Sequence, residues 1–260
     1  MKQTVQTNGI SLAYHEAGQG EALVFLHGFC GSSAYWERIA PELARTFRVI
    51  TPDLRGHGAS EVGDGTYSMD LLADDIAGLL KALRLEQAYV FGHSLGGYVT
   101  LALVDNHPEL VKGFGLIHST GLPDDKKAKE VRKERVTLIE EEGLEPFIND
   151  LIPRLFTPKN QEEMKDVVEH TRQIGLATPP KGAINTLQGM EIRPDRTTVL
   201  IKAKCPVLLV TGEDDHIIPS ESTWAGAPEH AMRETYSHCV HMSMYETPDN
   251  LIHTIQSFVK

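Results

Sequence analysis

The residues best suited to chemistry are a serine and its neighbours, Gly92-His93-Ser94-Leu95-Gly96, which follow the pattern Gly-x-Ser-x-Gly. A short apolar run precedes the pattern, and an apolar run typical of a helix follows it. This order predicts a sharp turn from a buried strand into a helix, with Ser94 strained at the apex. Glycine is needed at 92 and 96 because side chains there would collide with neighbouring backbone. The serine hydroxyl is then exposed above the positive end of the following helix.

A serine hydroxyl is a poor nucleophile until a base removes its proton. A histidine within hydrogen-bond reach commonly acts as that base, and a carboxylate on its other ring nitrogen holds the correct tautomer. Acyl transfer also needs N–H donors for the oxyanion that develops. The rest of the chain must therefore bring a histidine, a carboxylate and backbone N–H groups to Ser94.

The elements that would position these groups alternate between strands and helices. Asn8-Gly9 predicts an antiparallel hairpin at the start of the chain. Ser68 is suited to cap a helix whose apolar residues recur at helical spacing. The alternation predicts an α/β fold, a mainly parallel twisted sheet flanked by helices. The later strands are expected at residues 22–26, 47–51, 113–119, 206–211 and 232–236.

Between residues 122 and 195 the alternation stops, and the sequence predicts only helices. We therefore expect a core domain made of residues 1–121 and 196–260, with an all-helical insertion at 122–195. One predicted helix, residues 146–156, is rich in apolar side chains. Its apolar stripe is first a packing face, and secondarily a candidate wall of a substrate pocket that would include Phe147 and Leu151.

Five motifs together make the chain resemble the α/β-hydrolase superfamily over nearly its whole length. They occur in the family's chain order of nucleophile, acid and histidine. The resemblance is to serine carboxylesterase-like members, and it implies the α/β-hydrolase fold with the insertion as a cap over the active site. The motifs are His27-Gly28-Phe29, Asp53-Leu54-Arg55-Gly56-His57-Gly58-x-Ser60, Gly92-His93-Ser94-Leu95-Gly96-Gly97, Gly212-x-x-Asp215-x-x-x-Pro219, and His241 followed by Glu246-x-Pro248.

The resemblance implies that Ser94 is the nucleophile and that His241 is the base. The spacing from His241 to the following Glu-x-Pro motif matches the family. The competing base is His238, three residues earlier. The chain departs from the family at Val240, where glycine is usual before the histidine.

For the acid, the resemblance points to Asp215, three residues after a glycine and four before a proline. Its neighbour Asp214 is the nearest alternative. Some relatives take the acid from the loop after the preceding strand, which would be Asp124 or Asp125 here.

The resemblance also implies an oxyanion hole formed by the backbone N–H groups of Phe29 and Leu95. Two histidines are further candidates for the substrate pocket. His27 belongs to the same loop as Phe29, and His118 lies at the carboxyl end of a predicted strand, where ligands bind in such sheets. An ordinary hydrogen-bonded role would explain His118 equally well.

The resemblance implies hydrolysis of a carboxylic ester through an acyl-serine intermediate, without a cofactor. The haloalkane dehalogenase and epoxide hydrolase relatives use a carboxylate as the nucleophile at the apex. Serine at this position therefore argues against those two activities. The apolar helix and the absence of an evident arginine cluster favour small to medium uncharged esters. The same triad could serve a carbon–carbon bond hydrolase, a lactonase or a perhydrolase, and some relatives act as ligand receptors.

Composition narrows the partners. The formal net charge is −11 at pH 7, without a basic block, so nucleic acid and anionic membranes are not expected as partners. No secretory signal or membrane-spanning run is visible, and the three cysteines are irregularly spaced, so we expect a cytoplasmic protein. His238, Cys239 and His241 could bind a metal, but further ligands at fitting spacing are not evident, so no metal is expected. The sequence does not indicate an oligomeric state.

Overall fold

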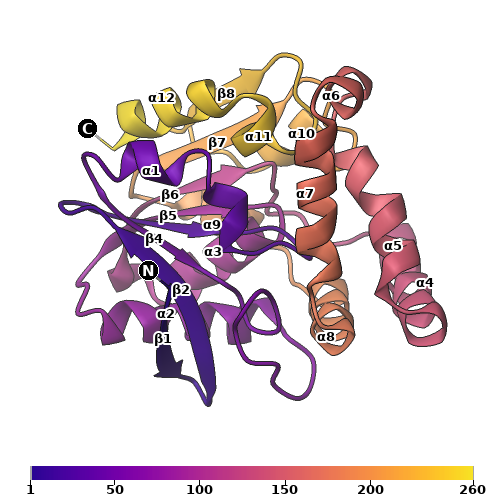
Figure 1. The fold of residues 1–260 in the computed structure, drawn as a ribbon. Helices are drawn as coiled ribbons and strands as arrows, with labels where there is room; N and C mark the ends of the chain where they lie inside the picture. Colours follow the sequence, from indigo (N-terminus) through magenta and orange to yellow (C-terminus); the bar gives the residue numbers. More distant parts are fainter. Residues whose placement is uncertain (1, 260) are drawn as a thin grey trace.

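Eight strands form one sheet in the computed structural model of this protein, which describes residues 2–259. Their order is β1-β2-β4-β3-β5-β6-β7-β8. The first two strands are antiparallel at one edge, and all later neighbours from β4 to β8 are parallel. Helices cover both faces (Figure 1). The predicted fold class, a mainly parallel sheet flanked by helices, is thereby confirmed.

The strands run close to their predicted positions, because each is an apolar run that the sheet buries. In β3, β5 and β7 every residue is buried, as expected for strands covered on both faces. Phe25 and Phe91 stack between neighbouring strands with ring centroids 5.1 Å apart. The strand bounds are β1 Lys2–Thr7, β2 Ile10–Ala17, β3 Ala22–Leu26, β4 Arg48–Pro52, β5 Ala88–His93, β6 Val111–Ile117, β7 Val207–Gly212 and β8 Met232–Tyr236.

The core helices lie in two groups, with α1 and α12 on one side of the sheet and α2, α3 and α9 on the other (Figure 1). Ser68 caps α2 as predicted, since its hydroxyl accepts a hydrogen bond from Leu71 N–H at 3.1 Å. The bounds are η1 Ser33–Trp36, α1 Ala40–Leu43, α2 Met69–Ala82, α3 Leu95–Asn106, η2 Pro108–Leu110, α9 Thr197–Lys202, α10 Ser220–Trp224, α11 Ser243–Glu246 and α12 Pro248–Phe258.

Three local features of the helices are not evident from apolar spacing alone. Residues 33–43 form two short pieces, because Pro41 has no N–H to continue the hydrogen-bond ladder and instead starts α1. The helix after the serine begins directly at Leu95, since the turn leads into it. The short helices α9 and α11 were not predicted.

Between β6 and β7 the described residues form only helices, which lie together beside the core in Figure 1. Helix α4 packs against α5 and α8, and α5 packs against α7. These elements fall inside the predicted insertion at 122–195, whose role as a separate cap stays a prediction. Their bounds are α4 Lys126–Glu142, α5 Leu144–Leu151, η3 Ile152–Leu155, α6 Pro158–Glu163, α7 Lys165–Leu176 and α8 Pro180–Glu191.

Across residues 2–259, every helix is too short or too polar to span a lipid bilayer.

Candidate active site

Ser94 occupies the turn between β5 and α3, in the backbone conformation that its motif predicts. Its φ of 50° and ψ of −113° are strained for a residue with a side chain. A Cβ atom at Gly92 would lie 2.2 Å from the Gly96 carbonyl oxygen, and one at Gly96 would lie 2.3 Å from that of Leu26. Both glycines are therefore required by close backbone contacts, as the sequence predicted.

Two hydrogen bonds hold the strained residue in place. The backbone N–H of Ser94 donates to the carbonyl of Ile117 at 3.0 Å, at the end of the neighbouring strand β6. The Ser119 hydroxyl donates to the Ser94 carbonyl at 2.7 Å. These contacts involve only the backbone of Ser94, so its hydroxyl is left to face the cavity that it lines.

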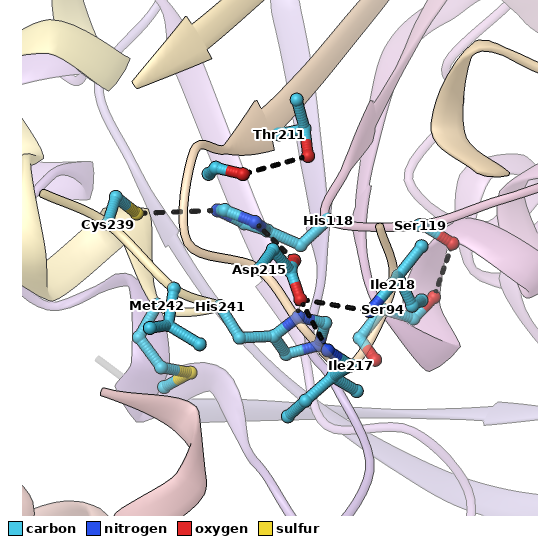
Figure 2. Close-up of polar contacts among 12 residues, drawn as sticks. Ser94, His118, Ser119, Thr211, Asp215, Ile217, Ile218, Cys239, His241 and Met242 are labelled. Atoms are coloured by element: carbon cyan, nitrogen blue, oxygen red, sulfur yellow. Dashed lines mark hydrogen bonds and ion pairs between the residues drawn. The ribbon is translucent and has the colours of Figure 1, made fainter. Parts of the chain in front are cut away.

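His241 and Asp215 form a buried pair beside this serine (Figure 2). The Nδ1–H of His241 donates to Asp215 Oδ2 at 2.9 Å. The other carboxylate oxygen accepts from the backbone N–H groups of Ile217 and Ile218, at 3.0 and 2.9 Å. The carboxylate is thereby fixed, and the imidazole presents Nε2 as its free nitrogen. His241 and Ser94 line the same cavity.

A second histidine shares the same carboxylate. His118 Nδ1–H donates to Asp215 Oδ2 at 3.0 Å, and on its far side His118 Nε2 lies 3.9 Å from the Cys239 sulfur (Figure 2). His118 is fully buried and has a positive φ of 49° at the end of β6. His118 therefore has an ordinary hydrogen-bonded role. It contacts the Asp215 carboxylate but does not line the cavity.

Electrostatics keep this carboxylate ionised. Burial by itself raises the pKa of Asp215, but the charge of His241 and the hydrogen bonds from both histidines outweigh burial, and the pKa is lowered far below its usual value. Burial is also the main reason why the pKa of His118 is lowered. A neutral His118 with its proton on Nδ1 fits the observed hydrogen bond.

His93 contacts the backbone of His241. The ring Nε2–H of His93 donates to the carbonyl oxygen of His241 at 2.8 Å. Burial lowers the pKa of His93 well below its ordinary value, so this ring is neutral. A Cβ atom at Gly28 would lie 2.6 Å from His93 Nδ1, so the loop that carries Phe29 is packed tightly on the same ring.

The competing candidates lie elsewhere. His238 and Asp214 are exposed, and His238 occupies a left-handed turn with φ of 57°. Asp124 forms ion pairs with Arg132 and Arg193. The Asp125 carboxylate caps α4 by accepting from Ala128 N–H at 2.7 Å. Of the acids considered, only Asp215 contacts His241.

The two proposed oxyanion donors flank the serine from different elements. Leu95 is the first residue of α3, and Phe29 lies on the loop after β3 and lines the cavity. Within residues 2–259 neither of their backbone N–H groups has a hydrogen-bond partner. Free N–H groups at a helix start suit a developing negative charge.

A cavity of about 560 Å³ opens onto Ser94 and His241. Phe147 and Leu151 lie in its wall. His27 and His118 do not line it, which corrects two pocket candidates. His27 is fully buried, accepts from Leu54 N–H at 2.9 Å and donates to the Gly28 carbonyl at 2.8 Å, so it shapes the loop instead.

The cavity wall also carries charges that the sequence did not group together. The sequence showed no evident cluster of arginines, but four arginines from the predicted insertion lie together in this wall. Three aspartates accompany them. The charged residues are Arg132, Arg135, Arg154 and Arg193, with Asp124, Asp125 and Asp150.

Glu246, which the sequence analysis used only for its spacing from His241, accepts several hydrogen bonds. One carboxylate oxygen accepts from Val240 N–H at 2.9 Å, and the other accepts from Thr157 N–H and the Asn160 side chain, each at 2.9 Å. His241 N–H itself donates to the Leu155 carbonyl at 3.1 Å. The loop that carries His241 is thus fastened to the helical insertion.

One group of side chains among the described residues lies close enough together to hold a metal ion. It consists of His118, Asp215 and His241, whose possible ligand atoms lie within 4.8 Å of one another. Both imidazoles turn Nδ1 toward the carboxylate and donate a proton to it. A metal at this point would replace both hydrogen bonds, whereas the hydrogen bonds account for the geometry as it stands. We therefore assign these atoms to hydrogen bonding.

The chain is similar to known hydrolases in sequence and in structure. A family model described as alpha/beta hydrolase fold matches residues 21–248. The 2-hydroxymuconate semialdehyde hydrolase of Pseudomonas sp. (strain CF600) is 42% identical over 118 residues, which is 44% of this chain and 42% of that protein. The 3-oxoadipate enol-lactonase 2 of Acinetobacter baylyi is 27% identical over 100% of this chain and 97% of its own length. A thermophilic esterase from Thermogutta terrifontis superimposes with a TM-score of 0.95 at 32% identity, covering 100% of this chain and 98% of the esterase.

Proposed function

This chain belongs to the alpha/beta hydrolase family, and from that premise we propose that it hydrolyses small to medium carboxylic esters through an acyl-serine intermediate. The observation that carries the proposal is the arrangement of three residues around one cavity. Ser94 lies at a strained apex, and His241 is held by Asp215 at 2.9 Å beside it. The esterase from Thermogutta terrifontis, at 32% identity over the whole chain, supports the same reaction class.

In the first half of the proposed reaction, Ser94 Oγ attacks the ester carbonyl carbon while His241 Nε2 takes its proton. Asp215 holds the imidazole in the tautomer that leaves Nε2 free, and stabilises the imidazolium that forms. The backbone N–H groups of Phe29 and Leu95 donate to the oxyanion. The alcohol leaves with the proton from His241.

In the second half, His241 takes a proton from water, which attacks the carbonyl carbon of acyl-Ser94 and releases the acid. Among residues 2–259, the polar contacts of His241 do not include a hydrogen bond to Ser94. Catalytic hydrogen bonds of free enzymes are often long and tighten when substrate binds. We propose that residues 122–195 act as the cap that encloses the substrate.

The test is a panel of p-nitrophenyl esters assayed with the wild type and with Ser94→Ala, each with and without a serine-reactive phosphonate. We expect the substitution to lower kcat on the order of 10⁶-fold. Mass spectrometry should find the phosphonate on Ser94 of the wild type only. Full ester turnover by a contaminant-free Ser94→Ala preparation would contradict the assignment of the nucleophile.

A second candidate reaction uses the same residues on a lactone or on a carbon–carbon bond next to a ketone. It is supported by two relatives, whose names are an enol-lactonase and a semialdehyde hydrolase. Parallel assays with lactones and β-diketones rank the two candidates by kcat/KM. A chain that retains such ligands tightly without turnover would instead be a binding protein.

A further inference from the structure

The wall of the active-site cavity carries an excess of positive charge, although the whole chain is strongly acidic. Four arginines and three aspartates line it, with no lysine or glutamate among the lining residues that are described. Their formal charges sum to +1, whereas the chain carries −11. A net positive charge at a cleft attracts ligands of negative charge.

Six of the seven charges form two clusters in which a pair of guanidinium groups shares one carboxylate. The seventh, Asp125, caps α4. In the inner cluster, Arg132 and Arg193 both bind Asp124, whose side chain is only 4% exposed. Burial by itself raises the pKa of Asp124, but the hydrogen bonds and charges of the two arginines outweigh it and lower the pKa. This carboxylate therefore stays ionised, and the inner cluster keeps a net charge of +1.

The inner cluster also lies close to the reacting serine. The guanidinium of Arg193 stacks over the ring of Tyr98, 4.1 Å from its centroid, and Tyr98 is one helical turn after Ser94. Arg193 is 7% exposed, and its buried Nε lacks a hydrogen-bond partner within the described chain. A buried positive charge is costly unless it is balanced.

The outer cluster is better placed to exchange partners. Arg135 and Arg154 both contact Asp150, at 2.8 and 3.6 Å, and the aspartate side chain is 47% exposed. The Arg154 contact is long and its side chain is 54% exposed, so breaking it costs little. Guanidinium groups bind carboxylates well because their planar N–H donors match the two oxygens.

From this charge pattern we infer the substrate class, on the basis of the esterase function proposed above: the natural substrate is an ester that also bears one free carboxylate. Arg135 and Arg154 bind that carboxylate in place of Asp150. The inner cluster supplies a fixed positive potential, and the apolar wall around Phe147 and Leu151 covers the carbon chain. This replaces the uncharged ester predicted from the sequence.

Three methyl esters of similar length test the inference, namely monomethyl glutarate, methyl valerate and methyl 4-(trimethylammonio)butyrate. Hydrolysis is followed with a pH indicator at low ionic strength. We expect kcat/KM to be at least roughly tenfold higher for the anionic ester than for the neutral one. This preference should shrink with added salt, because salt screens exposed charges.

Substitutions should move the preference in both directions. Arg135→Gln and Arg154→Gln should each lower the anionic-to-neutral ratio of kcat/KM by roughly three- to tenfold, and Asp150→Asn should raise it. Arg45→Gln is the matched control, because Arg45 is exposed and does not line the cavity. Circular dichroism confirms that each variant is folded.

The outcomes separate this inference from the proposed function. If the wild type hydrolyses methyl valerate as well as monomethyl glutarate, or prefers the cationic ester, the substrate inference is wrong while the esterase function stands. A fall in the ratio on Asp150→Asn contradicts it equally. If the wild type hydrolyses no ester in the set, the esterase function itself is wrong.

Discussion

At the scale of single residues, the carboxylate of Asp215 has an unusual environment, because one of its oxygens accepts hydrogen bonds from two imidazoles. His241 belongs to the proposed triad, and His118 occupies the position after β6. Each donor withdraws electron density from the carboxylate, so His118 weakens the stabilisation that Asp215 gives to the imidazolium that His241 forms during catalysis. His118 is thus a positioning residue with an electrostatic effect.

This effect is measurable in the pH dependence of the reaction. His118→Phe, which keeps a ring of similar size but cannot donate a hydrogen bond, is expected to move the acid limb of the kcat/KM profile to higher pH, because a carboxylate with one donor fewer stabilises the imidazolium of His241 more strongly. His93 also faces His241, and burial holds its pKa well below the ordinary value. The matched control is Cys239→Ala, which removes the contact behind His118 but leaves Asp215 untouched. An unchanged limb in His118→Phe would show that His118 has only a packing role.

A second prediction compares the two histidines of one loop. His241→Ala should lower kcat/KM for an ester by roughly 10⁴-fold or more, because Ser94 loses its base. His238→Ala should change it little, since His238 is exposed and outside the cavity. Steady-state kinetics on one ester decide the matter. A larger loss for His238→Ala would mean that His241 is not the base.

At the scale of elements, Glu246 fastens the loop of His241 to the start of α6. Glu246→Ala should lower the free energy of unfolding by about 2 kcal/mol, because two buried backbone N–H groups lose a charged acceptor. It should also lower kcat, since the loop of His241 is held by fewer contacts. Urea denaturation and ester kinetics measure the two effects, with the exposed Glu163→Ala as control. A stable variant with full activity would show that the junction is unnecessary.

The sequence predicted features that depend on neighbours along the chain. The turn at Ser94 was predictable because its glycines and flanking apolar runs are local. Features that depend on tertiary packing were not. His118 is 97 residues from its partner Asp215, and Arg135 meets Arg154 through helix packing that no local spacing reveals. The sequence spacing between His241 and Glu246 indicated that Glu246 matters, but it did not indicate which groups Glu246 contacts.

At the scale of the whole molecule, buried histidines make stability depend on pH. His27, His57, His93 and His118 are buried, and burial lowers the pKa of each below the unfolded value of 6.5, for His57 to about 3. A lowered pKa in the folded state means that the unfolded chain binds protons first as the pH falls. The stability from these residues is therefore complete above pH 6.5 and declines below it.

Urea unfolding between pH 8 and pH 4 should show this decline, with a slope of up to about 1.4 kcal/mol per pH unit for each histidine that titrates. His57→Gln should reduce the slope between pH 6.5 and pH 3, the window set by its own pKa shift. His253→Gln, at an exposed position, serves as control. Equal slopes for the two variants would contradict the assignment to buried histidines.

The junction at Glu246 also limits how substrate can enter. Because the η3–α6 end of the insertion shares hydrogen bonds with the loop of His241, lifting that end would pull the imidazole off Asp215. A movement of the insertion that preserves these hydrogen bonds would have to leave the η3–α6 end in place. The position of His241 and the position of this end of the insertion are therefore coupled.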